Sequence, residues 1–372
     1  MTEFKKRKYK SILNKHKFID SWFWDRYSIN PYQGCEHDCI FCDARSHKYN
    51  LHPEFEQLIY VKEDPAGMLD LRISRARTLL PDIVVISGVS DSYQPVEKKH
   101  KSTRKCLEVL AKHKWPVHIG TKSTLVLRDL DVLSEIAKKT WAAVSFTITT
   151  TDQKVADFIE PKAASSKERF EVISKIKKEA PYVQVGVNFI PIVPLLEDSE
   201  KNIDSVIKNA KEAGADYVLF SPGMTMRDNQ AVWFLRKLSK KFKKLIPQYE
   251  ELYKFKYNPE IYKGEYVPKR SYNFKIAKMV LKILEKYEMP YRIRRFIPND
   301  YREMNYIIAE NLLNKAYYLQ MTGKAWSNTH WAGQNIQNLK ESIIDVVKRG
   351  ELAQIRNVDD EIELFIREYL EY

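Results

Sequence analysis

Cysteine is scarce in this sequence, with four residues in a chain of 372. Three of them, Cys35, Cys39 and Cys42, lie within eight positions, and Cys106 stands alone far downstream. Small domains held together by disulfides carry more cysteines, spread along the chain. The clustering therefore argues against a disulfide framework and predicts metal binding or catalysis in a reducing compartment.

Long apolar runs are also absent. A membrane-spanning helix needs about 20 consecutive apolar residues, and the sequence has no run approaching that length. The lysine-rich N-terminus lacks the apolar stretch of a secretory signal. We therefore expect a cytoplasmic protein without a membrane span. There is also no internal repeat and no linker rich in glycine or serine.

Positive charge exceeds negative charge. The 62 lysine and arginine residues against 49 acidic ones give a formal net charge of +13. Such a charge attracts nucleic acid or another polyanion, but a lysine-rich proteome would give the same balance. Short basic runs do not identify a nucleic-acid site either, because most such runs lie on solvent-exposed faces of helices or loops. These runs cover residues 5–8, 98–101, 240–244 and 292–295.

From about residue 82 onward, short apolar runs alternate with amphipathic stretches. This alternation is typical of a parallel sheet covered by helices. Apolar spacing from Thr103 to Leu110 predicts one helix, and a capping box of Ser165 with Glu168 opens another. A strand near residues 27–32 brings the total to about six strand-helix units. The other expected strands cover residues 83–86, 117–119, 142–146, 183–187 and 217–220.

The pattern changes after about residue 225, where long charged helical stretches follow. We expect three segments: a basic N-terminal extension over residues 1–27, a core over 28–224 and a mainly helical extension over 225–372. Because no flexible linker separates them, the C-terminal extension is expected to pack on the core. Its expected elements are a strand at 291–297 and helices at 307–319 and 339–347.

The clustered cysteines have the spacing C-x3-C-x2-C. A structural zinc site usually has two C-x2-C pairs or a compact mixture of cysteine and histidine, and it closes with a fourth protein ligand. His37, inside the loop, could serve as that ligand. Iron-sulfur clusters also bind cysteine thiolates, commonly four. Three thiolates on a 4Fe-4S cluster would leave one iron open to another ligand.

The spacing, with Phe41 just before the last cysteine, resembles the radical S-adenosylmethionine (SAM) superfamily. The longer string NPYQGCEHDCIFCDAR, residues 30–45, is similar to the branch containing spore photoproduct lyase and the DNA-repair-photolyase-like proteins. Together with the strings downstream, the resemblance covers about residues 28–222. Those strings are SGVSDSYQPVEKKHKSTR, GTKSTLVLRDLDVL, SFTITTTD, EPKAASSKERF and NFIPIVPLLEDSEKNI.

The resemblance implies an α/β fold, a partial TIM-type (β/α)6 barrel with the helical extension at its C-terminal side. It also implies a 4Fe-4S cluster on Cys35, Cys39 and Cys42, with the amino and carboxylate groups of SAM on the open iron. One electron then cleaves SAM to methionine and a 5'-deoxyadenosyl radical. A reductant such as flavodoxin or ferredoxin would supply that electron. His37 would then be no ligand.

The resemblance also suggests SAM-binding residues at the strand ends. Ser90 and Asp91 suit the SAM ammonium, although alone they would be interpreted as a turn or capping pair. Lys122 and Ser123 suit the SAM carboxylate, although an exposed lysine is the simpler interpretation. On the strand SFTITT, the hydroxyls alternate onto one face, and the resemblance carries a SAM contact to its first serine. These strand residues are Ser145, Thr147 and Thr149.

The sequence departs from the spore enzyme in one respect. That enzyme returns hydrogen to the product radical from a cysteine just upstream of its Ser-Asp pair, where this chain has Gly88 and Val89. Cys106 lies on the apolar side of a helix and is expected to be a buried structural residue. Tyr93 or Tyr32 could relay hydrogen instead, so no catalytic residue is assigned.

The substrate stays open at this stage. The motif series and the basic charge suggest nucleic acid, and the alternatives are a radical SAM enzyme acting on RNA or on a protein or peptide. A hypothesis of another class is a zinc-stabilised nucleic-acid-binding protein without catalysis. Arg45 could stabilise a cluster or a substrate anion, or lie on an ordinary helix face. The oligomeric state is not predicted.

Overall fold

The computed structural model describes residues 2–86 and 88–371. They divide into two compact units. Unit 1 contains the described residues of 1–15 and 27–293, and unit 2 contains those of 16–26 and 294–372. In the part of the chain that is described, no helix has the length and hydropathy needed to cross a membrane.

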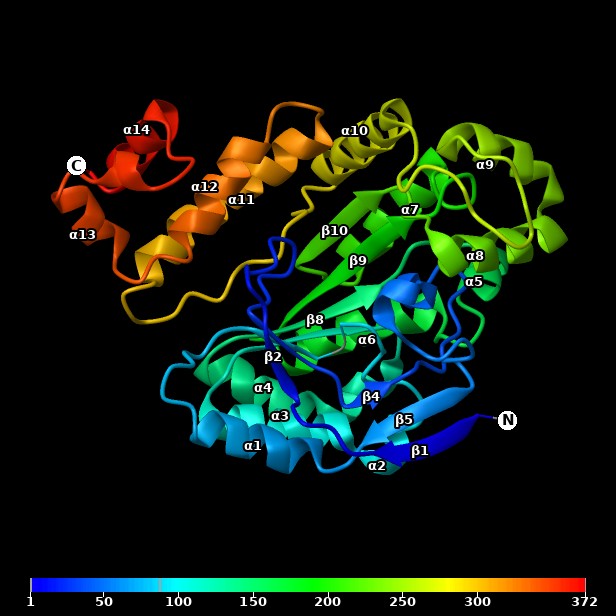
Figure 1. The fold of residues 1–372 in the computed structure, drawn as a ribbon, viewed down its shortest axis with the longest axis horizontal. Helices are drawn as coiled ribbons and strands as arrows, with labels where there is room; N and C mark the ends of the chain where they lie inside the picture. Colours follow the sequence, from blue (N-terminus) through cyan, green and yellow to red (C-terminus); the bar gives the residue numbers. More distant parts are fainter. Residues whose placement is uncertain (1, 87, 372) are drawn as a thin grey trace. The chain divides into compact units, whose positions relative to one another are not determined.

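The main sheet of unit 1 has seven strands in the order β10-β9-β8-β7-β6-β3-β2 (Figure 1). Neighbouring strands from β3 to β10 are parallel, and only β2 is antiparallel to its neighbour. This is the open, mostly parallel sheet of a partial TIM-type barrel, as predicted. The strands are β2 (Leu13–Lys15), β3 (Tyr27–Ile29), β6 (Val84–Ile86), β7 (Val117–Thr121), β8 (Ala142–Thr147), β9 (Gln184–Ile192) and β10 (Tyr217–Pro222).

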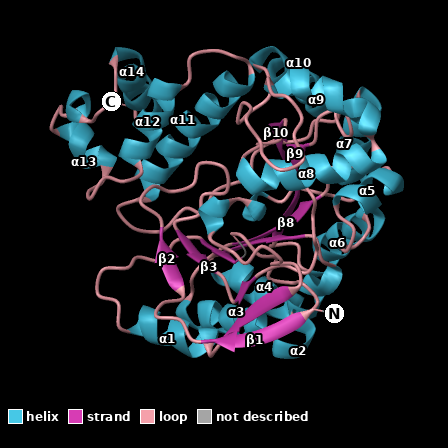
Figure 2. Ribbon diagram, turned by 45° about the vertical axis from the view of Figure 1, so that its right-hand side comes forward, coloured by secondary structure: helices cyan, strands magenta, loops and turns pink. Residues whose placement is uncertain are grey.

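Helices cover the outer side of this sheet (Figures 1 and 2). The longer ones, such as α3, α4, α6 and α7, each bury an apolar stripe, as the 3.6-residue period requires. The predicted capping box at Ser165 and Glu168 does open α6, and Cys106 is fully buried on the stripe of α3, as predicted. The helices are α1 (Pro65–Ser74), α2 (Glu97–His100), α3 (Ser102–His113), α4 (Leu130–Lys139), α5 (Gln153–Ile159), α6 (Ser166–Glu179) and α7 (Glu200–Glu212).

A second, three-stranded sheet has the order β1-β5-β4. β1 (Glu3–Arg7) pairs in parallel with β5 (Leu58–Lys62), and β5 pairs antiparallel with β4 (Tyr32–Gln33). The expected single strand over 27–32 is therefore two strands in different sheets, β3 and β4. The N-terminal residues do not form a separate extension, since they supply β1 and β2 to the two sheets of unit 1.

The helices after the barrel strands also belong to unit 1. Phe234 of α8 and Tyr249 and Tyr253 of α9 are buried in one apolar cluster with Phe41 of the cysteine loop. The units therefore do not divide at the expected boundary of residue 224, because the change of pattern there marks the end of the barrel strands and not of the packed core. These helices are α8 (Asp228–Lys241), α9 (Ile246–Tyr253) and α10 (Arg270–Lys286).

Unit 2 is helical. The segment 16–26 joins it through Gln334, whose Nε2 donates to the Ile19 carbonyl oxygen at 3.0 Å. The expected helix at 307–319 is confirmed inside α11, whereas the one expected at 339–347 begins later, after the Ser342 cap. The strand expected at 291–297 is wrong, since these residues form no strand. The helices are α11 (Glu303–Met321), α12 (Ser327–Ile336), α13 (Ile343–Lys348) and α14 (Asp360–Tyr369).

Candidate functional site

The three clustered cysteines lie in the loop that follows β4. Gly34 opens this loop with a φ of +95°. A Cβ on Gly34 would lie 2.6 Å from the Leu58 carbonyl oxygen and 2.7 Å from that of Phe55. The Cys35 N–H donates to the same Phe55 oxygen at 3.1 Å. Glycine is therefore required for the chain to pass close to this backbone and present the first cysteine.

Gln94, in the loop after β6, fixes the first half of the cysteine loop. Its Nε2 donates to the Gly34 carbonyl oxygen at 3.0 Å, and its Oε1 accepts the Glu36 N–H at 2.9 Å. The Glu36 carboxylate in turn accepts the Val96 N–H at 2.7 Å. Since Gln94 is fully buried, these bonds hold the two loops in one arrangement.

The second half of the cysteine loop is held by the elements that flank it. The Ile40 N–H donates to the Ile159 carbonyl oxygen at 2.9 Å. On α8, Gln230 donates from Nε2 to the Phe41 carbonyl oxygen at 3.3 Å. A backbone bond to α5 and a side-chain bond from α8 thus position the segment between Cys39 and the last cysteine.

The three thiols are protected from water. Cys35 and Cys39 are 8% and 7% exposed, and Cys42 is half-buried. Burial raises the pKa of all three thiols, to about 12 for Cys35. A thiol in such surroundings becomes a thiolate when a bound metal supplies positive charge. The donor set and its burial therefore fit a cysteine-ligated metal group.

The cysteine loop does not form a ready-made site for a single metal ion among the described residues. Within residues 2–86 and 88–371, no three histidine, cysteine or acidic side chains converge closely enough to hold one ion. In a 4Fe-4S cluster each thiolate binds a different iron, so the sulfur atoms need not converge on one point. A cluster therefore does not require the convergence of side chains that a single ion would require.

His37 does not face the thiols as a fourth ligand. Its Nε2 lies 3.2 Å from Oδ2 of Asp91, and its Nδ1 lies 3.2 Å from the Lys162 carbonyl oxygen. Burial lowers the pKa of His37, but the Asp91 carboxylate outweighs burial and raises it. Both ring nitrogens are thus directed at protein oxygens, which agrees with the prediction that His37 is no ligand.

Arg45 is buried and anchors the loop from inside. Its guanidinium donates to Asp38 at 2.6 Å and to Glu56 at 3.3 Å. The same group lies over two aromatic rings, 4.0 Å from the centre of Trp233 and 4.8 Å from that of Phe55. The helix-face interpretation of Arg45 is therefore wrong, because all faces of the guanidinium are in contact with protein.

Asp91 has its partners inside the protein. Its carboxylate accepts the Tyr93 N–H, the Lys122 N–H and the Thr121 hydroxyl, each at 2.8 Å, and lies beside His37. Burial raises the pKa of Asp91, but the His37 charge and these bonds lower it to about 2. Asp91 was expected to accept bonds from the SAM ammonium. In the structure it joins the loops after β4, β6 and β7.

A row of charged side chains, Lys122, Glu160 and Arg169, lies at the strand ends beside the cysteines. Lys122 Nζ lies 5.6 Å from the centre of the Phe41 ring and 3.9 Å from Oε1 of Glu160. The other Glu160 oxygen accepts from Arg169 at 2.7 Å. Burial lowers the pKa of Lys122, but negative charge nearby, above all at Cys39, raises it. Lys122 thus carries its charge next to the cysteine loop.

The other residues that were predicted to contact SAM lie in different kinds of positions. Ser90 is buried and lines a small cavity beside the cysteine loop. Ser123 caps the short helix η3 (Thr124–Asp129) by accepting the Leu125 N–H at 3.2 Å. Thr147 is half-buried at the end of β8, and its carbonyl oxygen accepts from Arg169. Ser90, Lys122 and Thr147 thus lie where strand ends meet the loops, whereas Ser123 caps a helix.

Ser145 lies deeper in the sheet than expected. Its hydroxyl is fully buried, 2.7 Å from Nε2 of His118 and 2.6 Å from the hydroxyl of Tyr217. Tyr217 reaches across β9 because Gly186 leaves room, since a Cβ there would lie 2.4 Å from the tyrosine ring. Ser145 is therefore part of a polar network across β7, β8 and β10, and not an open SAM contact.

The candidate hydrogen donors are also inside the protein. Cys106 is fully buried on α3. The Tyr32 hydroxyl donates to the carboxylate of Glu97, and burial raises the pKa of Tyr32. Tyr93 is fully buried beside the loop after β6. These positions do not single out either tyrosine as a relay.

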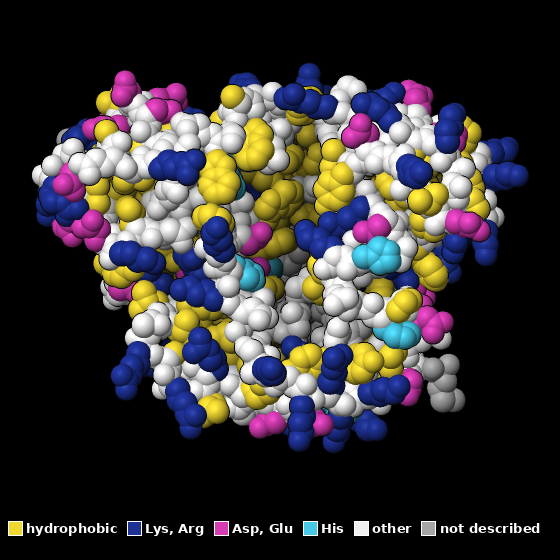
Figure 3. All heavy atoms as spheres, in the orientation of Figure 1, with side chains coloured by type: hydrophobic (Ala, Val, Ile, Leu, Met, Phe, Trp, Pro, Cys, Tyr) yellow, Lys and Arg dark blue, Asp and Glu magenta, His cyan; other side chains and the backbone are white. Residues whose placement is uncertain are grey.

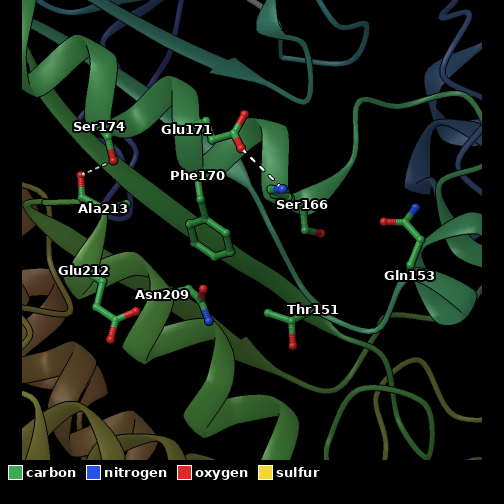
Figure 4. A pocket seen from close by; sticks show the side chains of 10 residues that line it. Thr151, Gln153, Ser166, Phe170, Glu171, Ser174, Asn209, Glu212 and Ala213 are labelled. Atoms are coloured by element: carbon green, nitrogen blue, oxygen red, sulfur yellow. Dashed lines mark hydrogen bonds and ion pairs between the residues drawn. The ribbon is translucent and has the colours of Figure 1, made fainter.

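A larger cavity, of about 440 Å³, lies away from the cysteines on the outer side of the barrel. Figure 4 shows Phe170 of α6 directed into it, opposite Asn209 and Glu212 of α7. Ser174 donates to the Ala213 carbonyl oxygen at 3.2 Å along one side. None of the residues predicted from the sequence to bind a cofactor lines this cavity.

Comparison with known proteins gives both a sequence family and relatives. Residues 29–207 match the pattern of the Radical SAM superfamily. An uncharacterized protein of Mycobacterium tuberculosis is 28% identical over 268 residues, which cover 71% of this chain and 75% of that protein. One from Acidianus two-tailed virus is 32% identical over 220 residues, covering 54% and 70%.

Solved structures of spore photoproduct lyase share the fold. A point mutant of that enzyme is 17% identical, with a TM-score of 0.56 over 76% of this chain and 78% of the enzyme. Its complex with a dinucleoside spore photoproduct is 18% identical, with the same TM-score over 76% and 79%. At this identity the likeness concerns the fold alone. The sequence match shows a radical SAM domain over residues 29–207, and the solved structures share its fold.

Proposed function

We propose that this protein is a radical SAM enzyme that binds a 4Fe-4S cluster on Cys35, Cys39 and Cys42. The observation that carries the proposal is a loop with two buried thiols and one half-buried thiol, in a stretch of sequence that matches the radical SAM superfamily. Among the described residues, His37 of this loop is directed at Asp91 and Lys162. When bound, the cluster supplies an open iron for SAM and the electron that cleaves SAM to a 5'-deoxyadenosyl radical.

The surrounding residues would orient SAM and exclude water. Lys122 keeps its positive charge beside the loop, where it can balance the SAM carboxylate. Ser90 and Thr147 offer hydroxyls at the ends of β6 and β8, on either side of β7. Asp91 acts as a positioning residue, because its oxygens join three loops. The electron would come from an external reductant such as flavodoxin or ferredoxin.

The proposed substrate is nucleic acid, with DNA-photolesion-lyase-like chemistry as the first candidate. The net charge of +13 supports a polyanionic substrate. The structural relative that binds a dinucleoside spore photoproduct supports the same class. RNA, or a protein or peptide, would suit the same radical chemistry, and the binding test below compares nucleic acid with an acidic peptide.

The test is anaerobic reconstitution with iron and sulfide. We expect the absorbance and electron paramagnetic resonance signals of a 4Fe-4S cluster, and 5'-deoxyadenosine from SAM with dithionite. Cys35→Ala, Cys39→Ala or Cys42→Ala should abolish both, because each removes one of three ligands. Cys106→Ala is the matched control, since this cysteine lies on α3 outside the loop.

Two outcomes would contradict the proposal. One is a fully loaded cluster that gives no 5'-deoxyadenosine. The other is one zinc ion per chain without sulfide after anaerobic purification, which would identify a structural zinc protein instead.

A further inference from the structure

A small cavity of about 200 Å³ lies beside the cysteine loop, at the ends of strands β3 and β6. Pockets for drug-sized ligands are larger, about 300–1,000 Å³, so this one has room for a single planar ring. Its lining contains three tyrosines, two side-chain amides and one lysine, without a carboxylate. The polar and aromatic lining residues are Tyr9, Asn30, Tyr32, Gln33, Tyr49, Lys62 and Ser90.

Aromatic surface and positive charge meet at Tyr9. The Lys62 ammonium lies 4.5 Å from the centre of its ring, and the Arg7 guanidinium lies 5.5 Å away. The Tyr9 hydroxyl donates to Oε1 of Gln33 at 2.6 Å, which fixes the ring at the cavity. Aromatic rings next to cations are the usual surface on which proteins stack nucleobases.

An exposed basic strand leads to this cavity. All five residues of β1 are exposed, and β1 is an edge strand of the small sheet. β1 pairs with β5, which ends at Lys62, and β5 pairs with β4, which enters the cysteine loop. Figure 3 shows many lysine and arginine side chains along the lower edge of this face of unit 1. Exposed cations in the N-terminal segment are Lys5, Lys6, Arg7, Lys8 and Lys10.

We propose that this cavity receives one base of a single-stranded or locally unpaired nucleic acid, with the phosphates on β1 and Lys62. The inference rests on the proposed function, because it places the base at the same strand ends as SAM. Stacking on tyrosine tolerates any base. The side-chain oxygens of Asn30 and Gln33 already accept from Gly88 and Tyr9, so their NH2 groups remain to donate to the edge of the base. A peptide would need a longer groove than this cavity provides.

The experiment measures binding of a fluorescent single-stranded oligonucleotide to the anaerobic, cluster-loaded protein by anisotropy. Tyr9→Leu should weaken binding about tenfold, whereas Tyr9→Phe keeps the ring and should bind nearly as well as the wild type. Lys62→Ala should weaken binding and lower the slope of log K against log salt concentration by about one. Tyr182→Leu is the matched control, because this tyrosine is 67% exposed and does not line the cavity.

Photo-cross-linking then locates the base. An oligonucleotide containing one 5-iodouracil should cross-link to a peptide containing Tyr9 or Tyr49. Cross-links only elsewhere would overturn the inference, as would Tyr9→Leu binding the oligonucleotide as tightly as the wild type. An acidic peptide that displaces the oligonucleotide from Tyr9 at lower concentration than competing single-stranded DNA would also overturn it.

The affinity for SAM separates this inference from the proposed function. Calorimetric titration of Tyr9→Leu with SAM should give the wild-type dissociation constant. If Tyr9→Leu instead weakens SAM binding tenfold, the cavity belongs to the SAM site and the inference fails, while the proposed function stands. If the wild-type protein binds oligonucleotide at Tyr9 but never cleaves SAM, the proposed function fails and the base site stands.

Discussion

Replacing Asp91 by asparagine tests whether this residue positions loops or binds SAM. The pKa of the buried Asp91 carboxyl falls from its usual 3.8 to about 2. At about 1.4 kcal/mol per pKa unit, the charged form contributes roughly 2 kcal/mol to folding. The asparagine amide would also face backbone N–H groups, such as that of Lys122, with a donor. We therefore expect Asp91→Asn to lose about 2–3 kcal/mol of stability.

The pH dependence of this loss follows from the direction of the pKa shift. A depressed carboxyl pKa stabilises the folded state above the unfolded value of 3.8, and this stabilisation is lost as pH falls towards 2. The difference between wild type and Asp91→Asn should therefore be largest at about pH 5 and shrink below about pH 4. It should also shrink as pH rises through the pKa of His37, which Asp91 raises.

The assay is urea unfolding followed by circular dichroism, with SAM affinity measured on the same preparations. Asp131→Asn is the matched control, because Asp131 is an exposed carboxylate paired with Arg104. Its loss should stay within about 1 kcal/mol. The reasoning is refuted if Asp91→Asn unfolds like the wild type but binds SAM at least tenfold more weakly. That result would place the carboxylate on the SAM ammonium.

Two further substitutions test the supports of the site. Gly186→Ala should lower the free energy of unfolding by about 1–3 kcal/mol in thermal or urea unfolding, because its Cβ would meet the Tyr217 ring at 2.4 Å. Gly120→Ala is the control and should change little, because its Cβ would enter open space. Equal losses for the two variants would contradict the packing argument. Arg45→Met should cost about 3 kcal/mol of folding free energy, because it removes the ion pair of the buried Glu56 carboxylate. It should also shorten the lifetime of the reconstituted cluster when a chelator is added. A cluster lifetime equal to that of the wild type would show that the loop does not depend on Arg45.

The parallel strands of the barrel could be predicted from the sequence because their signal is local. Each is a short apolar run between polar helices, and the predicted ranges 142–146 and 217–220 lie inside β8 and β10. Their ends were missed where polar residues continue the pairing. β7, for example, extends to Thr121, two residues beyond the predicted end.

The small sheet could not be predicted in the same way. All residues of β1 are exposed, so the strand shows no alternation of apolar and polar residues and depends on its pairing with β5. The opposite error occurred at residues 291–297, where a strand was expected and none forms. There the side chain of Arg295 is buried against the ring of Tyr306, 3.7 Å from its centre. An arginine in such a segment can therefore be buried against an aromatic ring.

In the candidate site, too, the sequence predicted the residue types better than their contacts. The cysteine loop could be predicted as a candidate site because three thiols at this spacing have few structural uses. Residues at strand ends are different, because a carboxylate or hydroxyl there can bind a ligand or join neighbouring loops. Asp91 and Ser145 make 2.6–2.8 Å bonds within the protein, while Glu160, which lies beside Lys122, carried no signal in the sequence. Spacing brings such groups to the barrel mouth, but their roles depend on contacts between segments far apart in the chain.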